Sequence, residues 1–227
     1  MSEQDKDNPA VKREAELNYG VTTLGQRDPV LVFNERTYVV LGVSRGGTSA
    51  AAGILHFLGV PMGPTGEAPL FEDLPMNRAL SQGVESVETL ITRNNAEKPV
   101  WGFKGNTITL PYEEIATRIR NPVFIVIFRD LLAIANRANL SAGRDVAAIM
   151  QRQSKEYQRI VDFVSTGRFY SVLVSYEKLC MYPEKVVDAI ADSAGLEVTA
   201  EQSQAASAFV RPAPEDYLKV SRARKKN

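Results

Sequence analysis

The chain has 227 residues, of which 44% are hydrophobic and 24% are charged, a composition typical of a soluble globular protein. Its 27 basic and 27 acidic side chains cancel, so no overall field favours a nucleic acid or a membrane surface as partner. One cysteine and one histidine exclude a disulfide framework and a thiolate or histidine metal cluster, and no apolar run is long enough to span a membrane. With its polar, acidic start, the chain is expected to be cytoplasmic and to use no metal.

The first elements are predicted from apolar patterns. Residues 1–29 are expected to form a flexible tail, and residues 30–227 a single domain with a basic C-terminal segment. Val30–Phe33 fits a small edge strand. Tyr38–Leu41 predicts a short buried strand, and the alanine-rich stretch Thr48–Leu58 predicts a helix.

A glycine-rich turn, Gly42–Gly47, joins this strand to this helix. Such units hold phosphate groups, because glycines let backbone N–H groups approach an anion and the helix N-terminus adds a positive dipole end. Arg45 adds a full charge inside the turn, and Thr48 and Ser49 place two hydroxyls at the helix start. The spacing is that of a Walker A loop with Thr48 in place of lysine, which argues against an ordinary nucleoside triphosphatase. The alternative is a structural turn with incidental glycines.

Strands and helices alternate along the rest of the chain, after a proline-rich loop over residues 60–75. The predicted strands are Pro99–Lys104, Val123–Phe128 and Phe169–Tyr176, and the predicted helices are Met76–Arg93, Leu110–Ile119, Leu131–Asn139, Asp145–Val164 and Pro183–Ala194. This alternation predicts an α/β fold with three layers, α/β/α, and a parallel sheet with right-handed crossovers.

Charged or aromatic residues directly follow each of the four main predicted strands. They are Arg45, Lys104, Arg129 and the pair Tyr176–Glu177. Ligands of open parallel sheets bind at the carboxyl ends of the strands. We therefore expect these residues to converge on one ligand site.

Three separated motifs, in the same order along the chain, resemble those of the sulfotransferase family. They are Arg45-Gly46-Gly47-Thr48-Ser49, Arg129-Asp130 and Tyr176-Glu177-Lys178-Leu179. The resemblance covers about residues 38–200 and implies a P-loop nucleotide-hydrolase-like sulfotransferase fold that uses 3′-phosphoadenosine-5′-phosphosulfate (PAPS). It implies that the residues of the first motif bind the 5′-phosphosulfate, that Arg129 binds the 3′-phosphate and that Tyr176 lies near the adenine.

Two further positions follow from the same resemblance. Arg137 stands where the family has a serine for the 3′-phosphate, and its guanidinium either holds that phosphate more strongly or points to solvent. The segment Val100–Gly105 is similar to a stretch of bacterial members. Arg45 and Lys104 are the candidates for stabilising the charge that grows on the leaving phosphate. A solvated lysine at a strand end is the alternative for Lys104, and a structural ion pair with Asp130 is the alternative for Arg129.

The acceptor group also needs a base to remove its proton. Glu72, with Asp73 as the next candidate, lies in the loop after the first helix, which can fold back over the donor. His56 lies eight residues beyond Thr48 on the same helix, or about 12 Å along its axis, which argues against it. A solvated acidic loop is the alternative for Glu72.

The predicted function is the transfer of a sulfuryl group from PAPS to a hydroxyl or amine of a small-molecule, lipid or sugar acceptor, with adenosine 3′,5′-bisphosphate as the product. Two alternatives from other classes are a P-loop kinase or nucleotidase, and a nucleotide-binding protein without catalysis. The sequence carries no signal for the oligomeric state.

Overall fold

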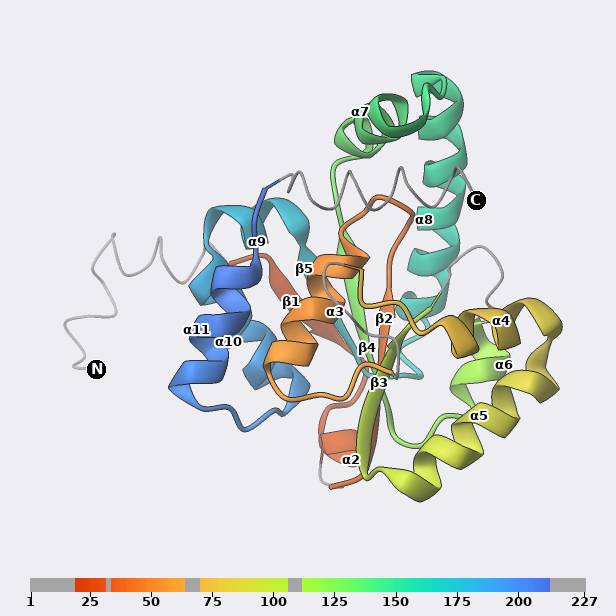
Figure 1. The fold of residues 1–227 in the computed structure, drawn as a ribbon, viewed down its shortest axis with the longest axis vertical. Helices are drawn as coiled ribbons and strands as arrows, with labels where there is room; N and C mark the ends of the chain where they lie inside the picture. The colour runs from red at the N-terminus through yellow and green to blue at the C-terminus, as the bar shows by residue number, and fades with distance from the viewer. Residues whose placement is uncertain (1–18, 32–33, 64–69, 106–111, 213–227) are drawn as a thin grey trace.

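A five-stranded sheet forms the centre of the computed structural model, which describes residues 19–31, 34–63, 70–105 and 112–212 (Figure 1). The strands are β1 Val21–Leu24, β2 Arg36–Leu41, β3 Val100–Lys104, β4 Pro122–Phe128 and β5 Ser171–Ser175. They lie in the order β1-β5-β4-β2-β3. β2, β3, β4 and β5 are parallel, and β1 pairs antiparallel with β5 at one edge.

Helices cover both faces of this sheet (Figure 1). They are α2 Asp28–Leu31, α3 Thr48–Phe57, α4 Leu74–Gln82, α5 Val84–Glu97, α6 Tyr112–Ala116, α7 Leu131–Ala142, α8 Val146–Ser165, α9 Tyr176–Met181, α10 Pro183–Ala194 and α11 Ala200–Phe209. α3, α9, α10 and α11 contribute to the hydrophobic core on one face, and α4 to α8 contribute to the core on the other. The predicted three-layer α/β/α architecture is therefore confirmed.

Successive side chains of a strand point to opposite faces of the sheet, so each strand contributes to the hydrophobic core on either face. In β2, Val39 and Leu41 belong to one core, whereas Tyr38 and Val40 belong to the other, and all four are fully buried. Residues 123–127 of β4 are also buried throughout. A strand of a parallel sheet with helices on both faces has no solvent side, which is why such strands appear as unbroken apolar runs.

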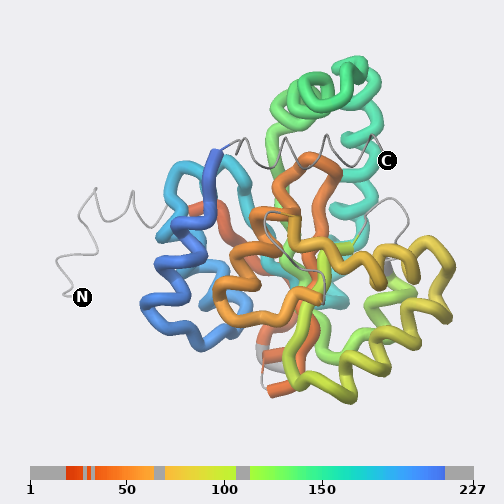
Figure 2. The backbone as a smooth tube through the Cα atoms, viewed as in Figure 1, coloured from red at the N-terminus to blue at the C-terminus, as the bar shows by residue number. Residues whose placement is uncertain are grey.

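The chain order of the parallel strands creates a switch point between β2 and β4. From β2 the chain crosses to β3 on one side, and it then returns to β4 on the other side of β2. Figure 2 shows this path, with the loop after β2 and the start of α7 at the same end of the sheet. A crevice for ligands opens at the carboxyl ends of the two strands where the order reverses in this way.

Several predicted elements differ from the structure. The predicted flexible tail over residues 1–29 contains β1, and the proposed strand Val30–Phe33 falls instead on α2, which ends at Leu31; residues 1–18, 32 and 33 lie outside the described residues. The single helix predicted over Met76–Arg93 is divided into α4 and α5 by Gly83, whose φ of 114° a helix does not accept. α9 and α11 were not predicted.

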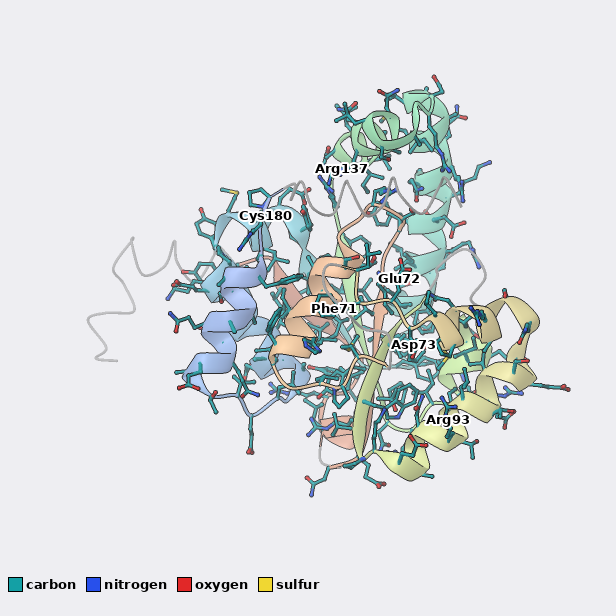
Figure 3. All side chains as sticks on the ribbon, in the orientation of Figure 1. Phe71, Glu72, Asp73, Arg93, Arg137 and Cys180 are labelled. Carbon is teal, nitrogen blue, oxygen red and sulfur yellow. The ribbon has the colours of Figure 1, made fainter. Side chains whose placement is uncertain are left out.

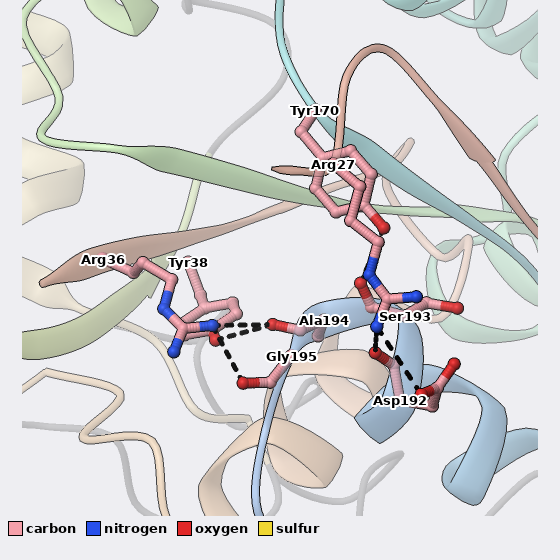
Figure 4. A network of polar contacts seen from close by, with 8 residues as sticks. All are labelled: Arg27, Arg36, Tyr38, Tyr170, Asp192, Ser193, Ala194 and Gly195. Carbon is pink, nitrogen blue, oxygen red and sulfur yellow. Dashed lines mark hydrogen bonds and ion pairs between the residues drawn. The ribbon is translucent and has the colours of Figure 1, made fainter. Parts of the chain in front are cut away.

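The amino ends of the strands are tied to the C-terminal end of α10 (Figure 4). The hydroxyls of Tyr38 and Tyr170 donate hydrogen bonds to the carbonyls of Ala194 (2.9 Å) and Ser193 (2.7 Å). Arg36 donates a hydrogen bond of 2.8 Å to the carbonyl of Gly195. These are carbonyls that a helix end leaves without an intrahelical partner. α10 is therefore fixed at the end of the sheet opposite the switch point.

In the part of the chain that the structure describes, no helix combines the length and the apolar character that crossing a lipid bilayer requires.

Asp145 is the N-cap of α8, and its carboxylate accepts a hydrogen bond of 2.7 Å from the Ala148 N–H. Asp145→Ala removes this cap, so we expect the free energy of unfolding to fall by about 1 kcal/mol in urea denaturation. Lys155→Ala, on the exposed surface of the same helix, is the control and should change it by less than about 0.5 kcal/mol. Equal changes in the two variants would contradict the capping role.

Candidate functional site

The loop between β2 and α3 has the geometry of an anion-binding turn. Gly47 is the N-cap of α3 with a φ of 101°, and its carbonyl accepts the N–H groups of Ala50 and Ala51. Among the described residues, no side chain caps the first turn of α3. The earliest N–H groups of the helix therefore point to the switch point without a built-in acceptor, as in helix termini that bind phosphate.

Two glycines of this loop allow neighbouring elements to approach. A Cβ on Gly42 would lie 2.9 Å from the carbonyl oxygen of Ile127 on β4 and 2.9 Å from Thr48. A Cβ on Gly47 would overlap the ring of Tyr176 on α9. Both positions therefore require glycine, because a larger residue would push the loop away from β4 and α9.

Arg45 has a φ of 70°, which is unusual for a residue that is not glycine. Such a conformation costs about 1–3 kcal/mol and persists only where the surrounding contacts determine it. One of these contacts is made by Arg129, whose Nη1 donates a hydrogen bond of 3.0 Å to the Arg45 carbonyl. The two predicted phosphate-binding arginines are thus joined directly in the structure.

Arg129 follows β4, and its guanidinium lies over the ring of Tyr176, with 4.5 Å between Cζ and the ring centroid. This is a cation–π contact between two residues predicted for the same nucleotide. The Nε of Arg129 is buried and has no hydrogen-bond partner within the described residues. Asp130, an alternative ion-pair partner for Arg129, uses its carboxylate to cap α7 through the Ala133 N–H at 2.7 Å.

Tyr176 begins α9 beneath this guanidinium. Burial, with a further contribution from the nearby Cys180, raises the pKa of the Tyr176 phenol to about 12 against an opposing effect of Arg129 and Arg137. The phenol therefore remains neutral at physiological pH and keeps its hydroxyl proton. Arg137, whose charge lowers the pKa of this phenol, belongs to α7, the helix that follows Arg129 and Asp130 (Figure 3).

Lys104, at the end of β3, is a buried residue with 8% exposure. Its Nζ donates to the Leu70 carbonyl at 2.6 Å and to the Ser49 hydroxyl at 3.1 Å. It also lies 3.7 Å from Oε1 of Glu72. The alternative of a solvated lysine is therefore wrong, and Lys104 connects β3, the first turn of α3 and the loop before α4.

Glu72 lies beside the first turn of α3, as the predicted folding back of its loop requires (Figure 3). Its side chain keeps 29% of its surface exposed, so it stays accessible to a ligand. The preceding residue, Phe71, is buried with a φ of 48°. This second strained residue turns the loop so that the phenyl ring enters the core while the neighbouring carboxylate faces Lys104.

The other two base candidates have structural contacts instead. Asp73 is almost fully buried, and its Oδ1 accepts the Met76 N–H at 2.9 Å as the N-cap of α4. Burial raises the pKa of its carboxyl group, partly offset by that hydrogen bond. His56 is in the last turn of α3, and its ring lies 5.1 Å from that of Phe71. The sequence thus predicts correctly that His56 is at the far end of α3.

The structure adds one residue to this arrangement that carries no signal in the sequence. Tyr157 on α8 appears in the sequence only as one member of an apolar helix face, yet its hydroxyl binds the backbone of Arg129. Glu177, which follows Tyr176, accepts the N–H of Asp130 at 2.8 Å. Both side chains hold the segment that carries Arg129.

Within the described residues, no group of three or more His, Cys, Asp and Glu side chains is placed to bind a metal ion.

No protein-family model matches the sequence, and no curated protein matches it. Several solved structures are similar to this chain, and two of them are sulfotransferases. The sulfotransferase domain of the olefin synthase from Synechococcus PCC 7002 covers 85% of this chain and 94% of its own, with 15% identity and a TM-score of 0.49. The sulfotransferase STF9 from Mycobacterium avium covers 87% of this chain and 78% of its own, with 15% identity and a TM-score of 0.47.

Gly47→Ala tests the loop geometry. The added methyl group meets both an unfavourable φ and the Tyr176 ring, so we expect the free energy of unfolding to fall by more than about 2 kcal/mol. Gly143→Ala is the matched control, because Gly143 has a φ of 61° but open space around its Cβ, and it should lose only about 1 kcal/mol. Equal losses in urea denaturation would show that Tyr176 does not restrict the loop.

Proposed function

We propose that this protein transfers a sulfuryl group from PAPS to a hydroxyl or amine group of a small-molecule, lipid or sugar acceptor in the cytoplasm. The observation that carries the proposal is the arrangement around the loop. Arg129 is bonded to the carbonyl of Arg45 on one side, and Lys104 is bonded to Ser49 and paired with Glu72 on the other. A nucleotide held by phosphates at both ends, with a carboxylate beside one of them, fits this pattern.

The residues present suit such a donor. The N–H groups of the loop and the start of α3 would hold the 5′-phosphosulfate. Arg129 would hold the 3′-phosphate, because its buried Nε is a charged donor without a hydrogen-bond partner in the described part of the chain. Arg137, which acts on the same phenol, would add a second guanidinium there. Bound in this way, PAPS supplies the sulfuryl group, and adenosine 3′,5′-bisphosphate leaves.

Charge grows on the 5′-phosphate as its bridging oxygen is released, and catalysis depends on stabilising that charge in the transition state. The hydrogen bond of Lys104 to Ser49 in the first turn of α3 supports this role for Lys104. Arg45 is the second candidate, since its backbone lies inside the anion-binding turn. Burial strengthens such an interaction, because a low local dielectric screens charges less than water does.

Glu72 is the proposed general base. As the bond from the acceptor oxygen or nitrogen to sulfur forms, the acceptor proton passes to the Glu72 carboxylate and the bond from sulfur to the phosphate oxygen breaks. The ion pair with Lys104 holds that carboxylate near the first turn of α3. The half-exposed position of Glu72 leaves room for an acceptor to approach from solvent.

A binding comparison separates this function from a P-loop kinase or nucleotidase. We expect adenosine 3′,5′-bisphosphate to bind in the micromolar range or tighter, at least about tenfold better than ATP, because a charge-assisted contact to the 3′-phosphate contributes about 1.5–3 kcal/mol. Isothermal titration calorimetry measures the dissociation constants of both nucleotides. Equal affinities, or tighter binding of ATP, would contradict the proposal.

Substitution of the base tests the assignment of roles. Once an acceptor is identified from a panel assayed with labelled PAPS, Glu72→Gln should lower the rate by about 10²-fold or more. It should also remove the rise of the rate with pH that deprotonation of a base produces. His56→Ala is the control and should change the rate little, since His56 packs on Phe71 at the far end of α3. A large loss in His56→Ala with none in Glu72→Gln would overturn the assignment.

A further inference from the structure

Arg129 lies where the hydrogen bonding of the sheet stops. The last pair between β4 and β5 joins Phe128 to Ser175, and the last pair between β4 and β2 joins Val126 to Leu41. The backbone of Arg129 is therefore beyond the strand ladder, while its side chain must be directed at the ligand site. Some other group has to fix the backbone conformation at this position.

That group is the hydroxyl of Tyr157, which comes from the middle of α8. It accepts a hydrogen bond of 2.8 Å from the Arg129 N–H and donates one of 3.0 Å to the Arg129 carbonyl. A hydroxyl can accept and donate at the same time, so one atom satisfies both backbone groups of a single residue. This double contact fixes the position of the peptide groups on both sides of the Arg129 Cα.

Tyr157 is itself held in place. Its ring stacks on Phe128, with 5.4 Å between the centroids and 26° between the planes. Burial raises the pKa of its phenol to about 12, so the hydroxyl keeps the proton that it donates at physiological pH. The adjacent N–H of Asp130 is bound separately by Glu177, which leaves the backbone of Arg129 to Tyr157.

We infer that Tyr157 is a positioning residue for Arg129, and that through it α8 sets the preference of this site for a nucleotide carrying a 3′-phosphate. This inference rests on the proposed function for the identity of the nucleotide. The hydroxyl of Tyr157 touches backbone atoms of Arg129. Tyr157 therefore affects a ligand only through the orientation of the Arg129 side chain. The Arg45 carbonyl and the Tyr176 ring contact the guanidinium of that side chain directly.

Tyr157→Phe removes one oxygen and keeps the ring that stacks on Phe128. Tyr170→Phe is the matched control, because Tyr170 is also a buried tyrosine whose hydroxyl binds a backbone carbonyl, at the amino end of β5. The first measurement needs no nucleotide. In amide hydrogen exchange followed by NMR, the Arg129 amide should exchange about fivefold or more faster in Tyr157→Phe, and within about twofold of the wild-type rate in Tyr170→Phe. An unchanged rate in Tyr157→Phe would overturn the inference.

The second measurement compares nucleotides with and without the 3′-phosphate. By calorimetry, Tyr157→Phe should raise the dissociation constant of adenosine 3′,5′-bisphosphate by about fivefold to tenfold. It should raise that of adenosine 5′-monophosphate by less than about twofold. Tyr170→Phe should leave both constants unchanged. An equal loss for both nucleotides would show a general loosening and would overturn the inference. If the wild-type protein does not prefer the 3′-phosphate, the proposed function fails, and the amide exchange of Arg129 still decides the role of Tyr157.

Discussion

The geometry of the site depends on the contacts of the Arg129 guanidinium. It donates to the carbonyl of Arg45 in the loop after β2 and stacks on Tyr176 at the start of α9, while its own backbone continues β4. Three consecutive strands of the sheet order are thereby connected at their carboxyl ends. These two contacts are with a carbonyl and an aromatic ring, which are both neutral.

On the other side of the site, the positive charge of Lys104 is paired with a carboxylate. Lys104 is buried beside the first turn of α3 and has a carboxylate, Glu72, within 3.7 Å. A buried ammonium group is costly without such a partner, because leaving water disfavours the charged form. The same contact brings the carboxylate to the loop. On this side a positive and a negative group therefore lie together, whereas the guanidinium of Arg129 contacts two neutral groups.

The sheet and its polar edge were predictable because both depend on local patterns. Residues 123–127 form an unbroken apolar run, and the position of Arg129 after that run places it at the carboxyl edge. β1 was missed because Val21–Leu24 is short and half exposed, and its stability comes from pairing with β5. The break at Gly83 was missed because apolar residues recur at helical spacing on both sides of it. The contacts of Tyr157 and Lys104 join segments far apart in the chain, and no periodic pattern encodes such pairs.

The pairing of β1 with β5 bears on how the chain behaves alongside its own copies. β1 occupies the outer side of β5, while the Gly102 N–H on the outer side of β3 donates to the Pro61 carbonyl at 2.9 Å. Uncovered strand edges are templates for pairing between chains, which leads to aggregation. Since β1 ends at Leu24, removing residues 1–30 would leave the outer side of β5 open to a second molecule. β1 thus extends the sheet and at the same time occupies the side of β5 on which a second molecule could pair.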